Sequence, residues 1–169
     1  MTRALVTYAT KHGGTADIGE AVADGLRTVG VEVDARDAID VKDVAGFDAV
    51  VVGSALYMNK WQSAAIDVLK RLESCPGVAV WMFSSGPTGG DAKSDAKAAE
   101  VLAAQPPAPG DAGKLATRLG VRGHVTFGGR IDESMTSFLE RWMPRGDWRD
   151  MDAARAWGAA IGTVLTDEP

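Results

Sequence analysis

The residues best suited to chemistry in this sequence lie in one short loop, Thr10-Lys11-His12-Gly13-Gly14-Thr15. The loop follows an apolar run at residues 4–8, which predicts a buried strand, and precedes residues 16–26, where apolar residues recur at helical spacing. The first amides of a helix have no partners within it, and the helix dipole makes that end positive. We therefore expect the loop to bind a phosphate group at the start of a helix.

The side chains of this loop suit an anion as well. Thr10 and Thr15 supply hydroxyl donors, and the adjacent glycines let the backbone approach an anion without interference from a Cβ atom. A plainer interpretation is a turn in which Thr15 only caps the helix. The spacing matches neither the dinucleotide-binding glycine pattern nor a P-loop, because no Gly-Lys-Ser or Gly-Lys-Thr follows. Both the phosphate loop and the plain turn stay open at this point.

Strand-like and helix-like segments alternate along the chain, which is typical of an α/β protein with a parallel sheet. Beyond the first strand and helix, the expected strands are residues 31–35, 47–54, 78–83 and 124–129. The expected helices are residues 61–72, 91–102, 114–119, 134–143 and 152–165, the last with Asp152 as its N-cap. This pattern matches a doubly wound five-stranded parallel sheet of order 2-1-3-4-5, with helices on both faces, in a single domain over residues 1–169.

The loops after the third and fourth strands should lie beside the first loop, because ligands of such sheets bind beyond the carboxyl ends of the strands. The third strand leads into Ala55-Leu56-Tyr57-Met58, and we expect Tyr57 first, or Trp61 second, to stack on a flat ring. The fourth strand leads into Ser85-Gly86-Pro87-Thr88-Gly89, whose amides suit the polar edge of a ring. The alternatives are ordinary packing for the two aromatic residues and a plain surface loop for the glycine-rich segment.

The chain resembles the flavodoxin family over essentially its whole length. The resemblance rests on residues 10–19, 51–57 and 127–130 and on Ser63-Ala64, and within the family these residues are similar to the branch of the menaquinone-dependent protoporphyrinogen oxidases. It implies non-covalent FMN, with the phosphate in the first loop and the isoalloxazine ring between the other two. The cofactor-binding residues that it implies are Thr10, Lys11, His12, Gly13, Gly14, Thr15, Ala55, Leu56, Tyr57, Met58, Ser85, Gly86, Pro87, Thr88 and Gly89.

The flavin that this resemblance implies would carry the redox chemistry, because no pair of residues in the three loops forms a dedicated acid and base. We expect an FMN-dependent oxidoreductase, similar to the protoporphyrinogen oxidases, that passes electrons from a flat organic substrate to a quinone. Lys11 and Lys60 at the expected rim and the apolar stripe of residues 134–143 favour this function, although the stripe also suits core packing. The alternatives are a soluble electron carrier between redox proteins and a flavin-free interaction protein.

The composition argues against several other classes of function. The formal net charge of −5 and the lack of a basic stripe argue against nucleic acid as a partner. Cys75 is the only cysteine, and His12 and His124 are the only histidines, which argues against a disulfide and against a zinc site. No apolar run approaches the roughly 20 residues of a membrane-spanning helix, and no signal peptide precedes the first strand, so we expect a cytoplasmic protein and leave peripheral membrane contact open.

Overall fold

The computed structural model describes residues 1–86, 108–131 and 145–167. The helices expected at residues 91–102 and 134–143 lie outside the described residues.

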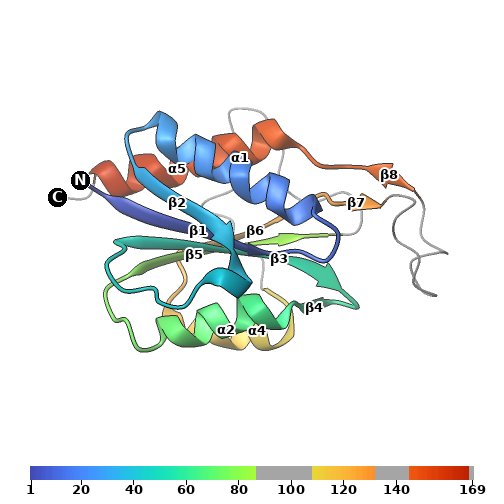
Figure 1. The fold of residues 1–169 in the computed structure, drawn as a ribbon, viewed down its shortest axis with the longest axis horizontal. Coiled ribbons are helices and arrows are strands. Elements are labelled where there is room, and N and C mark those ends of the chain that lie inside the picture. The colour runs from blue at the N-terminus through green and yellow to red at the C-terminus, as the bar shows by residue number, and fades with distance from the viewer. Residues whose placement is uncertain (87–107, 132–144, 168–169) are drawn as a thin grey trace.

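Within the described residues, the core of the protein is a parallel sheet of strand order β2-β1-β3-β5-β6 (Figure 1). The strands are β1 (Arg3–Ala9), β2 (Glu32–Asp37), β3 (Ala49–Tyr57), β5 (Ala79–Ser85) and β6 (Gly123–Phe127). β2 lies at one edge and alternates polar with apolar residues, whereas β3 and β5 are continuous apolar runs because both of their faces are covered. The predicted order of the five parallel strands is confirmed.

Helices cover both faces of this sheet, as the sequence predicts (Figure 1). On one face α1 (Gly14–Thr28) and α5 (Met151–Asp167) share a cluster of buried apolar residues with the sheet. On the other face α2 (Ser63–Leu72) and α4 (Gly110–Leu119) share a second cluster. The helices on the two faces bury the sheet. Its carboxyl edge, where β1, β3 and β5 end, carries the loops.

The helices α1 and α5 approach each other closely through glycine. A Cβ atom on Gly25 would lie 2.0 Å from the carbonyl oxygen of Arg155, and one on Gly158 would lie 2.1 Å from the carbonyl oxygen of Val22. The two backbones therefore touch where a side chain would otherwise separate them.

The start of α5 differs from the sequence-based expectation. Asp150 caps the helix, because its Oδ1 accepts a hydrogen bond of 2.9 Å from the backbone N–H of Ala153. The prediction of Asp152 as the N-cap is wrong, since Asp152 lies inside the first turn and pairs with Arg155 at 2.9 Å. Two aspartates so close together are equally plausible caps in sequence, and the chain, which reaches α5 from β8 (Gly146–Asp147), uses the earlier one.

Candidate functional site

The first loop turns sharply from β1 into α1. The hydroxyl oxygen of Thr10 accepts a hydrogen bond of 2.8 Å from the backbone N–H of Gly13. Gly13 has a left-handed backbone, with φ at 84°, which favours glycine, and it is the N-cap of α1. Thr15 is therefore not the N-cap of the plainer interpretation, but the second residue of the helix, with a side chain that is buried. Because glycine has no side chain to cap the helix, the first-turn amides are suited to an external anion.

The first and second loops meet through Lys11 and Tyr57. The ammonium nitrogen Nζ of Lys11 lies 3.6 Å from the centroid of the Tyr57 ring, a cation–π contact. The contact is close because β1 and β3 are neighbours in the sheet, paired from Ala4 with Ala49 to Ala9 with Ser54. Both loops thus leave the same sheet edge side by side, as the sequence predicts.

The second loop is a tight hairpin rather than the start of a helix. β3 pairs with the two-residue strand β4 (Lys60–Trp61) through a turn in which Met58 and Asn59 both have left-handed backbones. The prediction of a helix from residue 61 is wrong for its first two residues, because Trp61 pairs with Leu56 of β3 and Gln62 is the N-cap of α2, which begins at Ser63. Met58 is 69% exposed at the tip of this hairpin.

Trp61 anchors the hairpin to the sheet. Its indole Nε1 donates a hydrogen bond of 2.9 Å to the hydroxyl of Ser84, which in turn shares a hydrogen bond of 2.8 Å with Nε2 of His124. All three side chains are buried. Of the two aromatic residues that the sequence offers as a stacking platform, Tyr57 is thus partly exposed, whereas Trp61 is held inside the fold.

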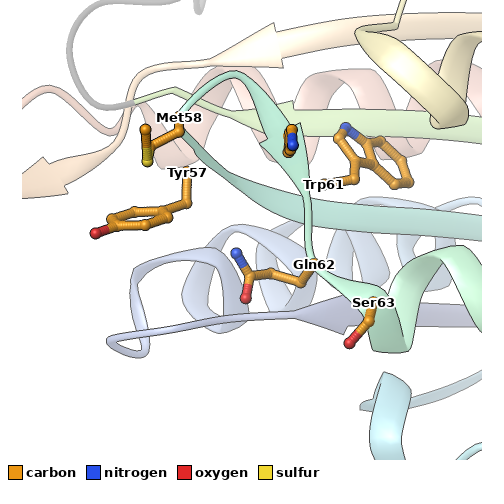
Figure 2. A pocket seen from close by; sticks show the side chains of 6 residues that line it. Tyr57, Met58, Trp61, Gln62 and Ser63 are labelled. Atoms are coloured by element: carbon orange, nitrogen blue, oxygen red, sulfur yellow. The ribbon is translucent and has the colours of Figure 1, made fainter.

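Figure 2 shows that the two aromatic side chains leave the hairpin in opposite directions, Tyr57 at the tip beside Met58 and Trp61 on the other side. The hairpin borders a pocket of about 280 Å³, lined by Tyr57, Met58, Lys60, Trp61, Gln62 and Ser63. Ala55 and Leu56 lie in β3 itself and are half-buried.

The third loop begins where β5 and β6 end together. Ser85 is the buried last residue of β5, and the N–H of Gly86 donates a hydrogen bond of 2.9 Å to the carbonyl of Phe127. A Cβ atom on Gly129 would lie 1.8 Å from the carbonyl oxygen of Gly86, so only glycine permits this approach. The remaining predicted residues of the loop, Pro87, Thr88 and Gly89, lie outside the described residues.

Arginine residues near the first loop were not recognised from the sequence as site residues. The strands β7 (Arg130–Ile131) and β8 form a two-stranded antiparallel ribbon. From β7, Nη2 of Arg130 donates a hydrogen bond of 3.1 Å to the carbonyl oxygen of His12. The available signal was the position of Arg130 directly after the Gly-Gly pair, but a contact across 118 residues leaves no periodic pattern.

A second arginine near the first loop balances acidic groups. Arg149 pairs with Asp17 of α1 at 2.5 Å and with Asp147 of β8 at 2.6 Å. Its hydrogen bond lowers the pKa of the Asp147 carboxyl to about 2. The pairing therefore stabilises the fold above the ordinary pKa of an aspartate, and this stabilisation is lost as the pH falls through about 2.

The described residues contain no group of three or more histidine, cysteine, aspartate and glutamate side chains that could hold a metal ion. Among the helices in the described part of the chain, none is long and apolar enough to cross a membrane.

Solved structures with the same fold include several flavodoxins. A flavodoxin from the domain Archaea is 16% identical, with a TM-score of 0.66, and the match covers 98% of this chain and 99% of that one. The Streptococcus pneumoniae TIGR4 flavodoxin is also 16% identical, with a TM-score of 0.61 and coverage of 96% and 99%. At these identities the likeness establishes the fold.

The same fold also occurs as one part of a longer protein. Rubredoxin oxygen:oxidoreductase from the anaerobe Desulfovibrio gigas is 13% identical, with a TM-score of 0.61, and the match covers 98% of this chain but 36% of that one. No curated protein matches the sequence. The family description of the flavodoxin domain matches residues 5–145, and the chain therefore belongs to the flavodoxin domain family.

Proposed function

We propose that this chain is an FMN-dependent oxidoreductase that exchanges electrons with a flat organic partner of the quinone type. The cofactor follows from the family, since a flavodoxin domain indicates FMN. The observation that carries the rest of the proposal is the contact of Lys11 Nζ with the Tyr57 ring at 3.6 Å. This contact links the first loop, which is suited to phosphate, to the second loop, which is suited to stacking on a flavin ring. It also places a positive charge at the expected site of the flavin ring.

The residues of the site fit FMN. The first turn of α1 has a glycine N-cap, and the Thr10 hydroxyl, whose oxygen accepts from Gly13, keeps its own proton for an acceptor such as a phosphate oxygen. Tyr57 supplies a partly exposed aromatic face at the next strand end. When bound, FMN supplies the electron-transfer chemistry, and the protein binds, orients and tunes it.

Positive charge beside the ring site favours a higher reduction potential than that of a flavin in an acidic site. A unit charge about 10 Å from a redox centre, at an effective dielectric constant near 20, contributes about 1.7 kcal/mol. For a one-electron step this corresponds to about 70 mV. Such a shift suits exchange with quinones, and the protoporphyrinogen oxidase-like reaction belongs to this class.

The function is tested by steady-state turnover of the FMN-loaded protein with protoporphyrinogen and a soluble menaquinone analogue, in the absence of any partner protein. Porphyrin formation faster than in a flavin-free control supports the oxidoreductase. No acceleration, together with rapid electron exchange with a flavoprotein reductase, supports instead an electron carrier. The carrier is the second candidate, because the fold matches an archaeal flavodoxin over 98% of this chain and 99% of that one.

Replacing Thr15 by alanine is expected to weaken FMN binding by about ten-fold or more while changing riboflavin binding much less. The physical reason is the loss of a hydrogen bond to the phosphate, since hydrogen bonds to charged groups contribute about 1.5–3 kcal/mol. The dissociation constants of the two flavins, measured by fluorescence titration, give the result. Equal losses for FMN and riboflavin would place the phosphate elsewhere.

Replacing Tyr57 by alanine is expected to raise the fluorescence of bound flavin, because an aromatic side chain stacked on the ring quenches it. Stacking also contributes about 0.5–1.5 kcal/mol beyond the burial of area, so the affinities for FMN and riboflavin should fall together. The matched control is Tyr8→Phe, because the Tyr8 side chain is buried and its hydroxyl bonds to Glu20. Unchanged fluorescence in the Tyr57 variant would show that this ring does not stack.

A further inference from the structure

The peptide bond between His12 and Gly13 is held at both of its polar atoms. Its carbonyl oxygen, on His12, accepts the hydrogen bond of 3.1 Å from Nη2 of Arg130. Its N–H, on Gly13, donates the hydrogen bond of 2.8 Å to Oγ1 of Thr10. Because a trans peptide is planar and its C=O and N–H point in opposite directions, these two bonds fix the orientation of the whole unit.

That peptide leads into Gly13, the N-cap of α1. Gly13 has φ at 84°, and the helix begins at the next residue. A loop that binds phosphate must turn its carbonyl oxygens away from the anion and its N–H groups toward it. The hydrogen bond from Arg130 occupies the His12 carbonyl oxygen, whose partial negative charge would repel an anion.

The backbone of Arg130 is also close to the loop. A Cβ atom built on Gly14 would lie 3.8 Å from Cβ of Arg130 and 4.0 Å from Cδ of Arg149. Figure 1 shows β7 beside the N-terminal end of α1, with the ribbon strand β8 next to it. The ribbon is itself tied to the helix, because Arg149 pairs with Asp17 in the first turn of α1.

The two arginines contact different groups near the first loop. Arg149 faces two carboxylates, those of Asp17 and Asp147, and it offsets acidic groups that would repel a phosphate. Arg130 contacts the first loop through the neutral carbonyl oxygen of His12, and its charge also helps to lower the pKa of the Asp147 carboxyl.

From this geometry we infer that Arg130 is the positioning residue of the first loop, and that it makes the site selective for a phosphorylated flavin over an unphosphorylated one. The inference rests on the proposed FMN binding and deepens it. Arg130 acts through the His12 peptide, and its positive charge adds to the attraction of the loop for the phosphate dianion.

The test compares the dissociation constants of FMN and riboflavin for the wild-type protein, Arg130→Gln and Arg130→Lys. Arg130→Gln is expected to lose about ten-fold in FMN affinity, the effect of one hydrogen bond from a charged group, with the riboflavin affinity within about two-fold of wild type. Arg130→Lys keeps the charge but not the planar guanidinium, so it should recover only part of the loss.

The matched control is Arg118→Gln, which removes an exposed arginine that pairs with Glu73. Arg118 lies in the last turn of α4, next to the start of β6 and so at the sheet edge opposite the loops. Its flavin affinities should equal those of wild type. Thermal unfolding of the flavin-free variants reports whether each of them is folded.

Three outcomes contradict the inference. Unchanged FMN affinity in Arg130→Gln would show that the loop does not need this residue, and an equal loss for FMN and riboflavin would reduce Arg130 to a general structural role. Full recovery in Arg130→Lys would assign the effect to charge alone. Failure of the wild-type protein to bind FMN would instead overturn the proposed function, so the two failures are distinguishable.

Discussion

Gly158→Ala is expected to lower the free energy of unfolding by about 1–3 kcal/mol, the cost of inserting a methyl group into a tightly packed interior. The added Cβ atom would lie 2.1 Å from the carbonyl oxygen of Val22, which belongs to the backbone of α1 and cannot rotate away. The helices would have to separate, and the buried side chains of Trp157 and Ile161 would lose contacts. Urea denaturation followed by circular dichroism measures the change.

The matched control in the same helix is Thr163→Ala, at an exposed position. Surface substitutions away from special features change the free energy of unfolding by less than about 0.5 kcal/mol. In an uncrowded helix, replacing glycine by alanine raises the free energy of unfolding by roughly 0.4–1 kcal/mol. A rise of this size in Gly158→Ala would contradict the close approach of α1 and α5.

The sheet could be predicted from the sequence because its inner strands have a strong signal. Residues 49–53 and 78–83 are continuous apolar runs of strand length, and burial on both faces is the simplest explanation of such runs. The short elements could not be predicted. β4, β7 and β8 have two residues each, too few to show a period, and Trp61 fits the apolar face of the helix after it as well as it fits a strand.

The site could be predicted in part, for a different physical reason. Because ligands of such sheets bind at the carboxyl edge, the sequence predicts that the first and second loops lie together. The contact of Lys11 with Tyr57 agrees with this prediction. The roles of Trp61 and Arg130 depend on side-chain contacts between residues far apart in the chain, to Ser84 and to His12. Such contacts follow from the packed structure and leave no mark in local spacing.

Gly129→Ala is expected to weaken the binding of FMN and riboflavin alike, by about ten-fold or more. The new Cβ atom would lie 1.8 Å from the carbonyl oxygen of Gly86, so the ends of β5 and β6 would have to move apart. That movement breaks the hydrogen bond from the Gly86 N–H to the Phe127 carbonyl, which sets the start of the third loop. A displacement that costs about 1.4 kcal/mol or more at the ring site corresponds to this loss.

The comparison of the two flavins separates this effect from that at the phosphate loop. Because the third loop is expected to face the ring, which FMN and riboflavin share, Gly129→Ala should reduce both affinities by the same factor, whereas Thr15→Ala should reduce mainly that for FMN. Isothermal titration with each flavin measures both factors. The close approach of α1 and α5 at Gly25 and Gly158 does not involve Gly86, so the variant should still unfold cooperatively. A loss of affinity for FMN alone would show that Gly129 supports the phosphate site rather than the ring site. Unchanged affinity for both flavins would show that the third loop does not contact the ring.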